Sequence, residues 1–107
     1  MHFNQVRYFL ALCEERNFNL AAKRCGVSQP TLSVGIIRLE TIFGGELFYR
    51  QHRPTQLTEL GEAVKPHLKE INSSVGQAHR AAKSVRAARR VRSELLRSRI
   101  SRAAEEK

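Results

Sequence analysis

The stretch VSQPTLS at residues 27–33 holds the polar side chains whose types and spacing best fit a chemical role. Gln29 carries an amide that can pair with the edge of an adenine, and the Ser33 hydroxyl can bond a base or a phosphate. Arg38, further along, is long enough to reach a phosphate backbone. These residues indicate contact with nucleic acid, although each of them also fits an ordinary solvated helix surface.

Apolar residues lie among these polar ones. Pro30, Val34 and Ile37 can offer contacts to the methyl groups of thymines. If the stretch from Ser28 is helical, its first-turn N–H groups and its dipole favour a phosphate. A major groove is about wide enough for one α-helix. The pattern therefore predicts a helix that reads DNA in the major groove.

Two arginines flank a polar turn in the segment ELFYRQHRPTQLT. Arg50 and Arg53 could neutralise phosphates or enter a minor groove from this turn. The alternative is that they only keep the edge of a hairpin soluble. The sequence leaves both interpretations open.

Neither the histidines nor the cysteines form a pattern that supports catalysis or metal binding. The histidines, which do not cluster with carboxylates or with a nucleophile, are His2, His52, His67 and His79. His67 and His79 lie too far apart in the sequence for a metal-ligand pair. Cys13 and Cys25 fall at apolar-periodic positions, where a free cysteine behaves as a small hydrophobe. We therefore expect no enzyme activity, no cofactor and no metal.

The net charge of the chain also indicates a nucleic-acid partner. The chain has 107 residues and a formal net charge of +9, which favours a polyanion, with nucleic acid first. More than half of the excess lies in residues 86–107. The first residues are too often charged for a signal peptide, and no apolar run approaches the ~18 residues of a membrane span. We expect a reducing cytosol and no membrane partner.

Three helices are expected in the first half of the chain. The first ends near Asn17 and carries apolar residues at helical spacing, namely Phe3, Val6, Phe9, Leu10 and Cys13. The second has Asn19 as its N-cap and ends at Gly26 in the left-handed conformation. The third begins at Ser28, ends at Gly44 and buries a stripe made of Leu32, Ile36, Leu39 and Phe43. Two short helices, a tight glycine turn and a third helix make a helix-turn-helix.

A small wing and a long helix are expected to follow. Tyr49–Arg50 and Gln56–Leu57 can form two short strands, and Thr58 then caps the helix. The apolar residues of this helix follow a heptad spacing, which is typical of pairing with a partner helix. They are Val64, Leu68, Ile71, Val75, Ala78, Ala82 and Val85. We expect a homodimer formed through this helix.

The predicted fold is therefore mainly α: a winged helix-turn-helix of three helices plus a small two-stranded wing, followed by a long linker helix. The predicted segments are a DNA-binding domain over 1–58, a linker or dimerisation helix over 59–85, and a basic, helix-prone tail over 86–107. The boundary near residue 86 rests on the end of the heptad spacing and on the change in composition.

The segment from Phe18 to Val64 resembles the DNA-binding domain of LysR-type transcriptional regulators. The motifs VSQPTLS, IIRLE, ELFYR and LTELG stand in the register of that family's pattern, and the resemblance covers about residues 1–85. It implies paired linker helices and a roughly palindromic site in double-stranded DNA. Together with the reasoning above, it predicts a set of DNA-contacting residues: Asn19, Ser28, Gln29, Pro30, Thr31, Ser33, Val34, Arg38, Arg50 and Arg53.

The chain also departs from the family. Val34, Gly35 and Ile37 stand where members often have basic or polar residues, so the helix presents fewer phosphate-binding charges. Gly35 should also weaken the helix by about 1 kcal/mol relative to alanine. Members usually continue into a small-molecule-binding domain, which residues 86–107 do not begin, so no effector is expected. The expected location is the bacterial cytoplasm, in association with the nucleoid.

Two other functions fit the same sequence. The long helix could pair with a full-length relative and form a mixed dimer, which the apolar face at residues 34–37 would favour. Alternatively, the basic tail could make the chain a nucleic-acid binder with little sequence preference.

Overall fold

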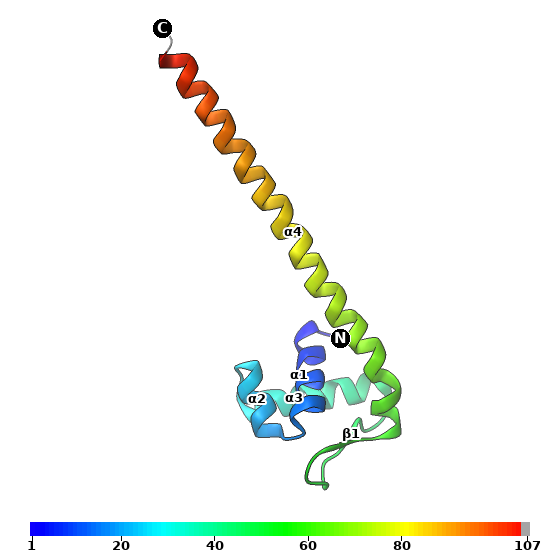
Figure 1. The fold of residues 1–107 in the computed structure, drawn as a ribbon. Coiled ribbons are helices and arrows are strands. Elements are labelled where there is room, and N and C mark those ends of the chain that lie inside the picture. The colour runs from blue at the N-terminus through cyan, green and yellow to red at the C-terminus, as the bar shows by residue number, and fades with distance from the viewer. Residues whose placement is uncertain (106–107) are drawn as a thin grey trace. The chain divides into compact units, whose positions relative to one another are not determined.

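In the computed structural model, residues 1–105 are described and form four helices and two strands. The elements in chain order are α1 (Phe3–Glu15), α2 (Phe18–Cys25), α3 (Gln29–Phe43), β1 (Phe48–Tyr49), β2 (Gln56–Leu57) and α4 (Glu59–Glu105). This is the predicted winged helix-turn-helix with a long helix after it, so the prediction of the fold class is confirmed (Figure 1).

Helices α1, α2 and α3 pack against one another around one apolar core (Figure 1). Phe9 and Leu12 of α1 are fully buried, as are Leu32, Ile36 and Leu39 of α3. The stripe predicted for α3 is therefore confirmed, except that its last member, Phe43, is only partly buried. Because this stripe faces the core, the opposite face of α3 is left to solvent.

The ends of these helices follow local capping rules, with one correction. Gly26 and Gly44 end α2 and α3 at φ of 70° and 82°, as predicted. The Ser28 hydroxyl accepts a hydrogen bond from the Thr31 N–H, 3.3 Å, and so caps α3. The N-cap of α2, however, is Asn17 and not Asn19: the Asn17 side chain accepts from the Leu20 N–H at 2.9 Å. Asn19 therefore lies in the first turn of the helix.

The wing is a two-stranded antiparallel sheet in which Phe48 is opposite Leu57 and Tyr49 is opposite Gln56. The first strand thus begins one residue earlier than Tyr49–Arg50. Phe48 is buried and its ring lies 5.3 Å from that of Phe9, whereas Tyr49 is exposed. Packing of Phe48 on the core fixes this register, since neighbouring strand residues point to opposite faces.

The start of α4 is attached to the wing by Thr58. Its hydroxyl donates to the Glu46 carbonyl at 2.6 Å and accepts from the Gly61 N–H at 3.0 Å. Its own N–H donates to the Leu47 carbonyl at 3.0 Å. Thr58 therefore caps α4 as predicted, and it also fixes the helix to the segment before β1.

Two compact units divide the chain, Met1–Ser73 and the part that begins at Ser74. The first unit contains the beginning of α4, whose Leu60, Val64 and Leu68 pack against the core. Helix α4 runs through residue 86 without a break. The division into functional segments at residues 58 and 86 stays a prediction. In the described part of the chain, no helix is both long enough and apolar enough to cross a bilayer.

Gly35 has a structural reason that the sequence did not reveal. A methyl group at this position would lie 2.6 Å from Cδ2 of Tyr8, whose ring is buried against α3. The absence of a side chain therefore allows α1 and α3 to approach closely, and this offsets the poor helix propensity of glycine.

We expect Gly35→Ala to destabilise the fold by about 1–2 kcal/mol, because overpacking exceeds the gain of about 1 kcal/mol in helix propensity. In a Tyr8→Ala background the same substitution should instead be neutral or stabilising. A double-mutant cycle by urea denaturation measures the coupling. Equal effects of Gly35→Ala in both backgrounds would contradict the assigned contact.

Candidate nucleic-acid interface

The exposed face of α3 carries the apolar residues that the sequence predicted to contact DNA. Pro30, Val34, Ile37 and Thr41 form a stripe along it, and all four are exposed. Arg38 flanks this stripe and is also exposed. The structure therefore brings these side chains together on one solvent-facing surface.

The first turn of α3 is arranged by hydrogen bonds among its own side chains. The Ser28 hydroxyl donates to that of Thr31 at 2.9 Å, and the Gln29 amide donates to the Ser33 hydroxyl at 3.0 Å. The Gln29 carbonyl oxygen and its second N–H remain available, so its amide can still donate and accept at once. The bond to Ser33 holds this amide at the surface.

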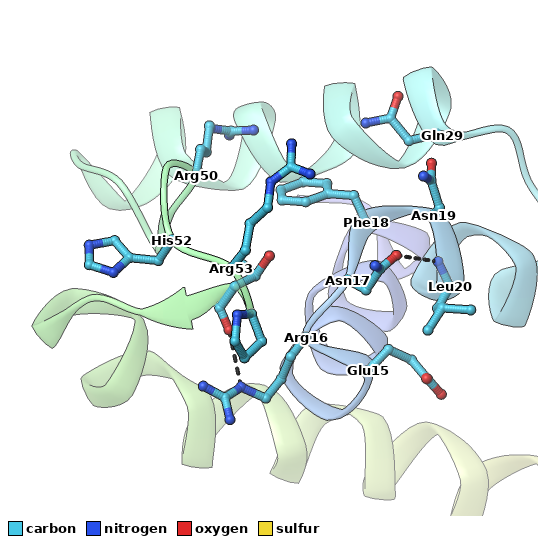
Figure 2. Close-up of a pocket in the computed structure, with 12 residues that line it drawn as sticks. Glu15, Arg16, Asn17, Phe18, Asn19, Leu20, Gln29, Arg50, His52 and Arg53 are labelled. Carbon is cyan, nitrogen blue, oxygen red and sulfur yellow. Dashed lines mark hydrogen bonds between the residues drawn. The ribbon is translucent and has the colours of Figure 1, made fainter.

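A cleft of about 470 Å³ lies between the wing and the beginnings of α2 and α3. Figure 2 shows Arg50, His52 and Arg53 of the wing across from Asn17, Asn19 and Gln29. The beginnings of two helices thus lie beside basic side chains, and the positive ends of the helix dipoles and these side chains both favour an anion.

Arg50 is used differently from the prediction that it neutralises a phosphate. Its guanidinium forms an ion pair with Glu40 of α3 and lies over the Phe18 ring, 5.6 Å from the centroid. The other oxygen of Glu40 accepts from the Leu47 N–H at 2.8 Å. Arg50 therefore fixes the wing to α3, because its charge is already matched inside the protein.

Arg53 differs from Arg50 in its surroundings. It is exposed on the loop between β1 and β2 and lines the cleft. Among residues 1–105, the ion pairs join Arg24 to Glu14 and Glu15, and Arg50 to Glu40. Arg38 and Arg53 take part in neither set, so their charges face solvent.

Arg16 is a residue of this surface that sequence reasoning missed. It takes φ of 54°, its Nε donates to the Thr55 carbonyl at 3.2 Å, and its carbonyl accepts from the Thr55 N–H at 3.0 Å. The wing loop is thereby attached to the turn between α1 and α2. No local pattern indicates this contact, since the partners are far apart in the sequence.

The cysteines have the character expected of apolar residues. Burial raises the pKa of Cys13 to about 11, and burial also raises the pKa of Cys25. A thiol with a raised pKa is a poor nucleophile and a poor metal ligand at neutral pH, because the thiolate is the reactive form. The described residues contain no group of three side chains arranged to hold a metal ion.

The apolar stripe of α4 divides into two parts, which corrects one residue of the predicted dimer contact. Leu68 is 2% exposed and belongs to the chain's own core, and Val64 is partly buried against it. The chain's own core therefore explains why these two positions are apolar, without a partner helix. The remaining members are Ile71, Ala78, Ala82 and Val85, which are exposed, and Val75, which is partly buried.

The order α1, α2, α3, wing and long helix, together with the exposed face of α3, defines a winged helix-turn-helix protein. The family model described as "Bacterial regulatory helix-turn-helix protein, lysR family" matches residues 3–62, which is more than half of the chain. The chain therefore belongs to the LysR family, and the resemblance seen in its sequence motifs is confirmed.

Similar proteins agree with this assignment. The "HTH-type transcriptional regulator BudR" of Klebsiella aerogenes is 51% identical over 63 residues, covering 59% of this chain and 44% of BudR. The "HTH-type transcriptional regulator IlvR" of Caulobacter vibrioides is 41% identical over 75 residues, covering 70% and 25%. The chain thus spans less than half the length of these two relatives.

Solved structures resemble the fold closely. The chain BenM_DBD, in complex with benA site 1 DNA, has a TM-score of 0.73 and 33% identity, covering 79% of this chain and 96% of that one. CbnR_DBD, also in a DNA complex, has a TM-score of 0.72 and 34% identity, covering 79% and 98%.

Proposed function

We propose that this chain is the DNA-binding part of a transcriptional regulator, and that it binds a two-fold symmetric site in double-stranded DNA as a homodimer. Helix α3 enters the major groove, and Arg53 of the wing contacts phosphates or the adjacent minor groove. The proposed role is recognition without catalysis. DNA complexes of the similar chains BenM_DBD and CbnR_DBD support it.

The observation that carries the proposal is the arrangement of α3. One face is fixed in the core by Leu32, Ile36 and Leu39, and the other is exposed beside a basic wing. A helix held in this way can enter a groove about 12 Å wide without rearrangement of the fold. In this arrangement we expect Gln29 to contact a base and Arg38 to contact a phosphate.

Dimerisation is supported by the exposed part of the α4 stripe. Ile71 and Val85 are 38% and 52% exposed, and they share a heptad spacing with Val75, Ala78 and Ala82. A narrow apolar stripe on an otherwise polar helix suits a second helix of the same kind. Two copies related by a two-fold axis would bind two half-sites of a palindrome.

The test is fluorescence-anisotropy binding to a randomised DNA pool and to a pool enriched from it, at two salt concentrations. We expect clear preference for an enriched, two-fold symmetric site. Gln29→Ala should reduce that preference, whereas Arg38→Ala should weaken binding to both pools and lower the salt slope by about 1. Equal, strongly salt-dependent binding to both pools would overturn the proposal.

A mixed dimer is the second candidate, favoured by the same exposed stripe on α4. In that case the chain pairs with a longer LysR-family protein and weakens its DNA binding. Sedimentation of the purified chain separates the two: a homodimer that binds the enriched site supports the first function. A monomer that associates only after addition of a longer family member supports the second.

The basic end of α4 yields a separate prediction. Seven arginines between Arg86 and Arg102 are exposed, and each that contacts a phosphate adds about 0.9 to the slope of log affinity against log salt. Deleting residues 86–107 should therefore flatten the salt dependence while the ratio of enriched to random binding survives. If the deletion abolishes binding to both pools equally, unspecific coating by the tail is the function.

A further inference from the structure

Two β-branched side chains are exposed in the middle of α3, where the fold does not require them. Val34 and Ile37 are 47% and 50% exposed, and neither belongs to the core. They are three residues apart on one helix and therefore lie side by side. Valine and isoleucine are less favourable than alanine in a helix, because their χ1 freedom is restricted there. Their presence thus needs a reason outside the stability of this helix.

The surroundings of the pair restrict what that reason can be. Pro30 and Thr41 continue the stripe at its two ends, Gln29 and Ser33 lie along one side, and Arg38 lies along the other. Hydrogen-bonding groups that suit bases and phosphates therefore border a small methyl-rich area. This area is on the face of α3 that the proposed function directs into the major groove.

We infer that Val34 and Ile37 are specificity-determining residues that recognise thymine through its C5 methyl group. This inference rests on the proposed function. Thymine alone presents a methyl group in the major groove, whereas guanine, cytosine and adenine present hydrogen-bonding groups at their edges. An apolar side chain gains contact with the methyl group of thymine. The same side chain leaves the amino group of a cytosine without a hydrogen-bond partner, so it selects against cytosine at that position.

The decisive experiment replaces single thymines of the enriched site by deoxyuridine. This exchange removes the methyl group and keeps the base pair and its hydrogen-bonding pattern. For the full chain, we expect about fourfold weaker binding for each contacted methyl group removed, from the usual value of a buried methylene. Thymines outside the half-site centres serve as internal controls.

Variants assign the effect to residues. Val34→Ala and Ile37→Ala should each bind the thymine site more weakly and lose the discrimination against deoxyuridine at one position. Ile42→Ala is the matched control, because Ile42 is also 50% exposed on α3 but lies on a different side of the helix. It should leave the discrimination unchanged. All three should keep the thermal stability of the full chain, since exposed side chains are removed.

The possible results distinguish a failure of thymine recognition by Val34 and Ile37 from a failure of the proposed DNA binding. A clear enriched site that the chain binds equally with thymine or deoxyuridine overturns the inference and leaves the proposed function standing. Absence of any enriched site overturns both. Discrimination that persists in the Val34→Ala and Ile37→Ala double variant shows that other residues recognise the methyl groups, and it also overturns the inference. The first result needs no variant, so it does not depend on how the substitutions fold.

Discussion

Gly61→Ala is expected to lower the stability of the first unit by about 2–3 kcal/mol, although alanine is the better helix former by about 1 kcal/mol. A methyl group at Gly61 would overlap the Leu47 carbonyl oxygen and lie 2.7 Å from Cδ2 of Leu57. The carbonyl cannot move aside easily, because it accepts the Thr58 N–H at 3.0 Å. The substitution must therefore push α4 away from the wing.

Thermal denaturation followed by circular dichroism measures this effect. At about 4–8 °C per kcal/mol for a unit of this size, the midpoint should fall by roughly 10–20 °C. Gly76→Ala is the control, because a methyl group there meets only the guanidinium end of Arg80, at 3.3 Å. It should leave the midpoint of the first unit unchanged. A Gly61→Ala protein as stable as the parent would show that α4 does not lie against Leu47 as described.

The helix ends and the core face of α3 could be predicted from the sequence because local rules determine them. Ser28 caps α3 with its own hydroxyl, and Gly26 and Gly44 take the left-handed conformation that ends a helix. Apolar spacing identified Leu32 and Ile36 as core residues before any packing was known. These features depend on neighbours within four residues, which the sequence shows directly.

Local rules were ambiguous where two residues suited the same role. Asn17 and Asn19 are both good N-cap residues, and the structure uses Asn17, which directly follows the left-handed Arg16 at the end of α1. Leu68 fits a heptad stripe and a domain core equally well, since both require the same spacing. The structure uses it in the core, because the first turns of α4 pack against the wing and α1–α3.

Long-range contacts explain what the sequence could not predict about the surface. In the sequence, an arginine beside a predicted wing looks the same whether it binds a phosphate of DNA or a carboxylate of the protein. Arg50 contacts Glu40, ten positions away, and the Phe18 ring on another helix. Arg53, three positions later, has its charge in solvent and remains in the proposed interface. Only the folded chain separates the arginine that is paired with Glu40 from the one whose charge is left in solvent.

Glu40 gives the second large effect, because its one carboxylate connects α3 to the residues on either side of β1. One oxygen pairs with Arg50, and the other accepts the Leu47 N–H at 2.8 Å, while the side chain itself is only 11% exposed. Glu40→Ala leaves the exposed guanidinium of Arg50 and the part-buried N–H of Leu47 without partners. We expect a loss of about 2–3 kcal/mol in stability, mainly because the unpaired Leu47 N–H keeps its desolvation penalty, with a smaller part from the lost ion pair.

Glu40→Gln tests which of the two contacts matters more. A glutamine oxygen can still accept the Leu47 N–H, but the ion pair with Arg50 is gone, so the loss should be about 1–2 kcal/mol. Arg50→Ala should lower the stability by a similar amount, because the ion pair is lost and the Glu40 carboxylate keeps only its hydrogen bond from the Leu47 N–H. Urea denaturation ranks the three variants. If Glu40→Ala and Glu40→Gln are equally destabilising, the hydrogen bond to Leu47 contributes nothing, and the wing is held by the ion pair alone.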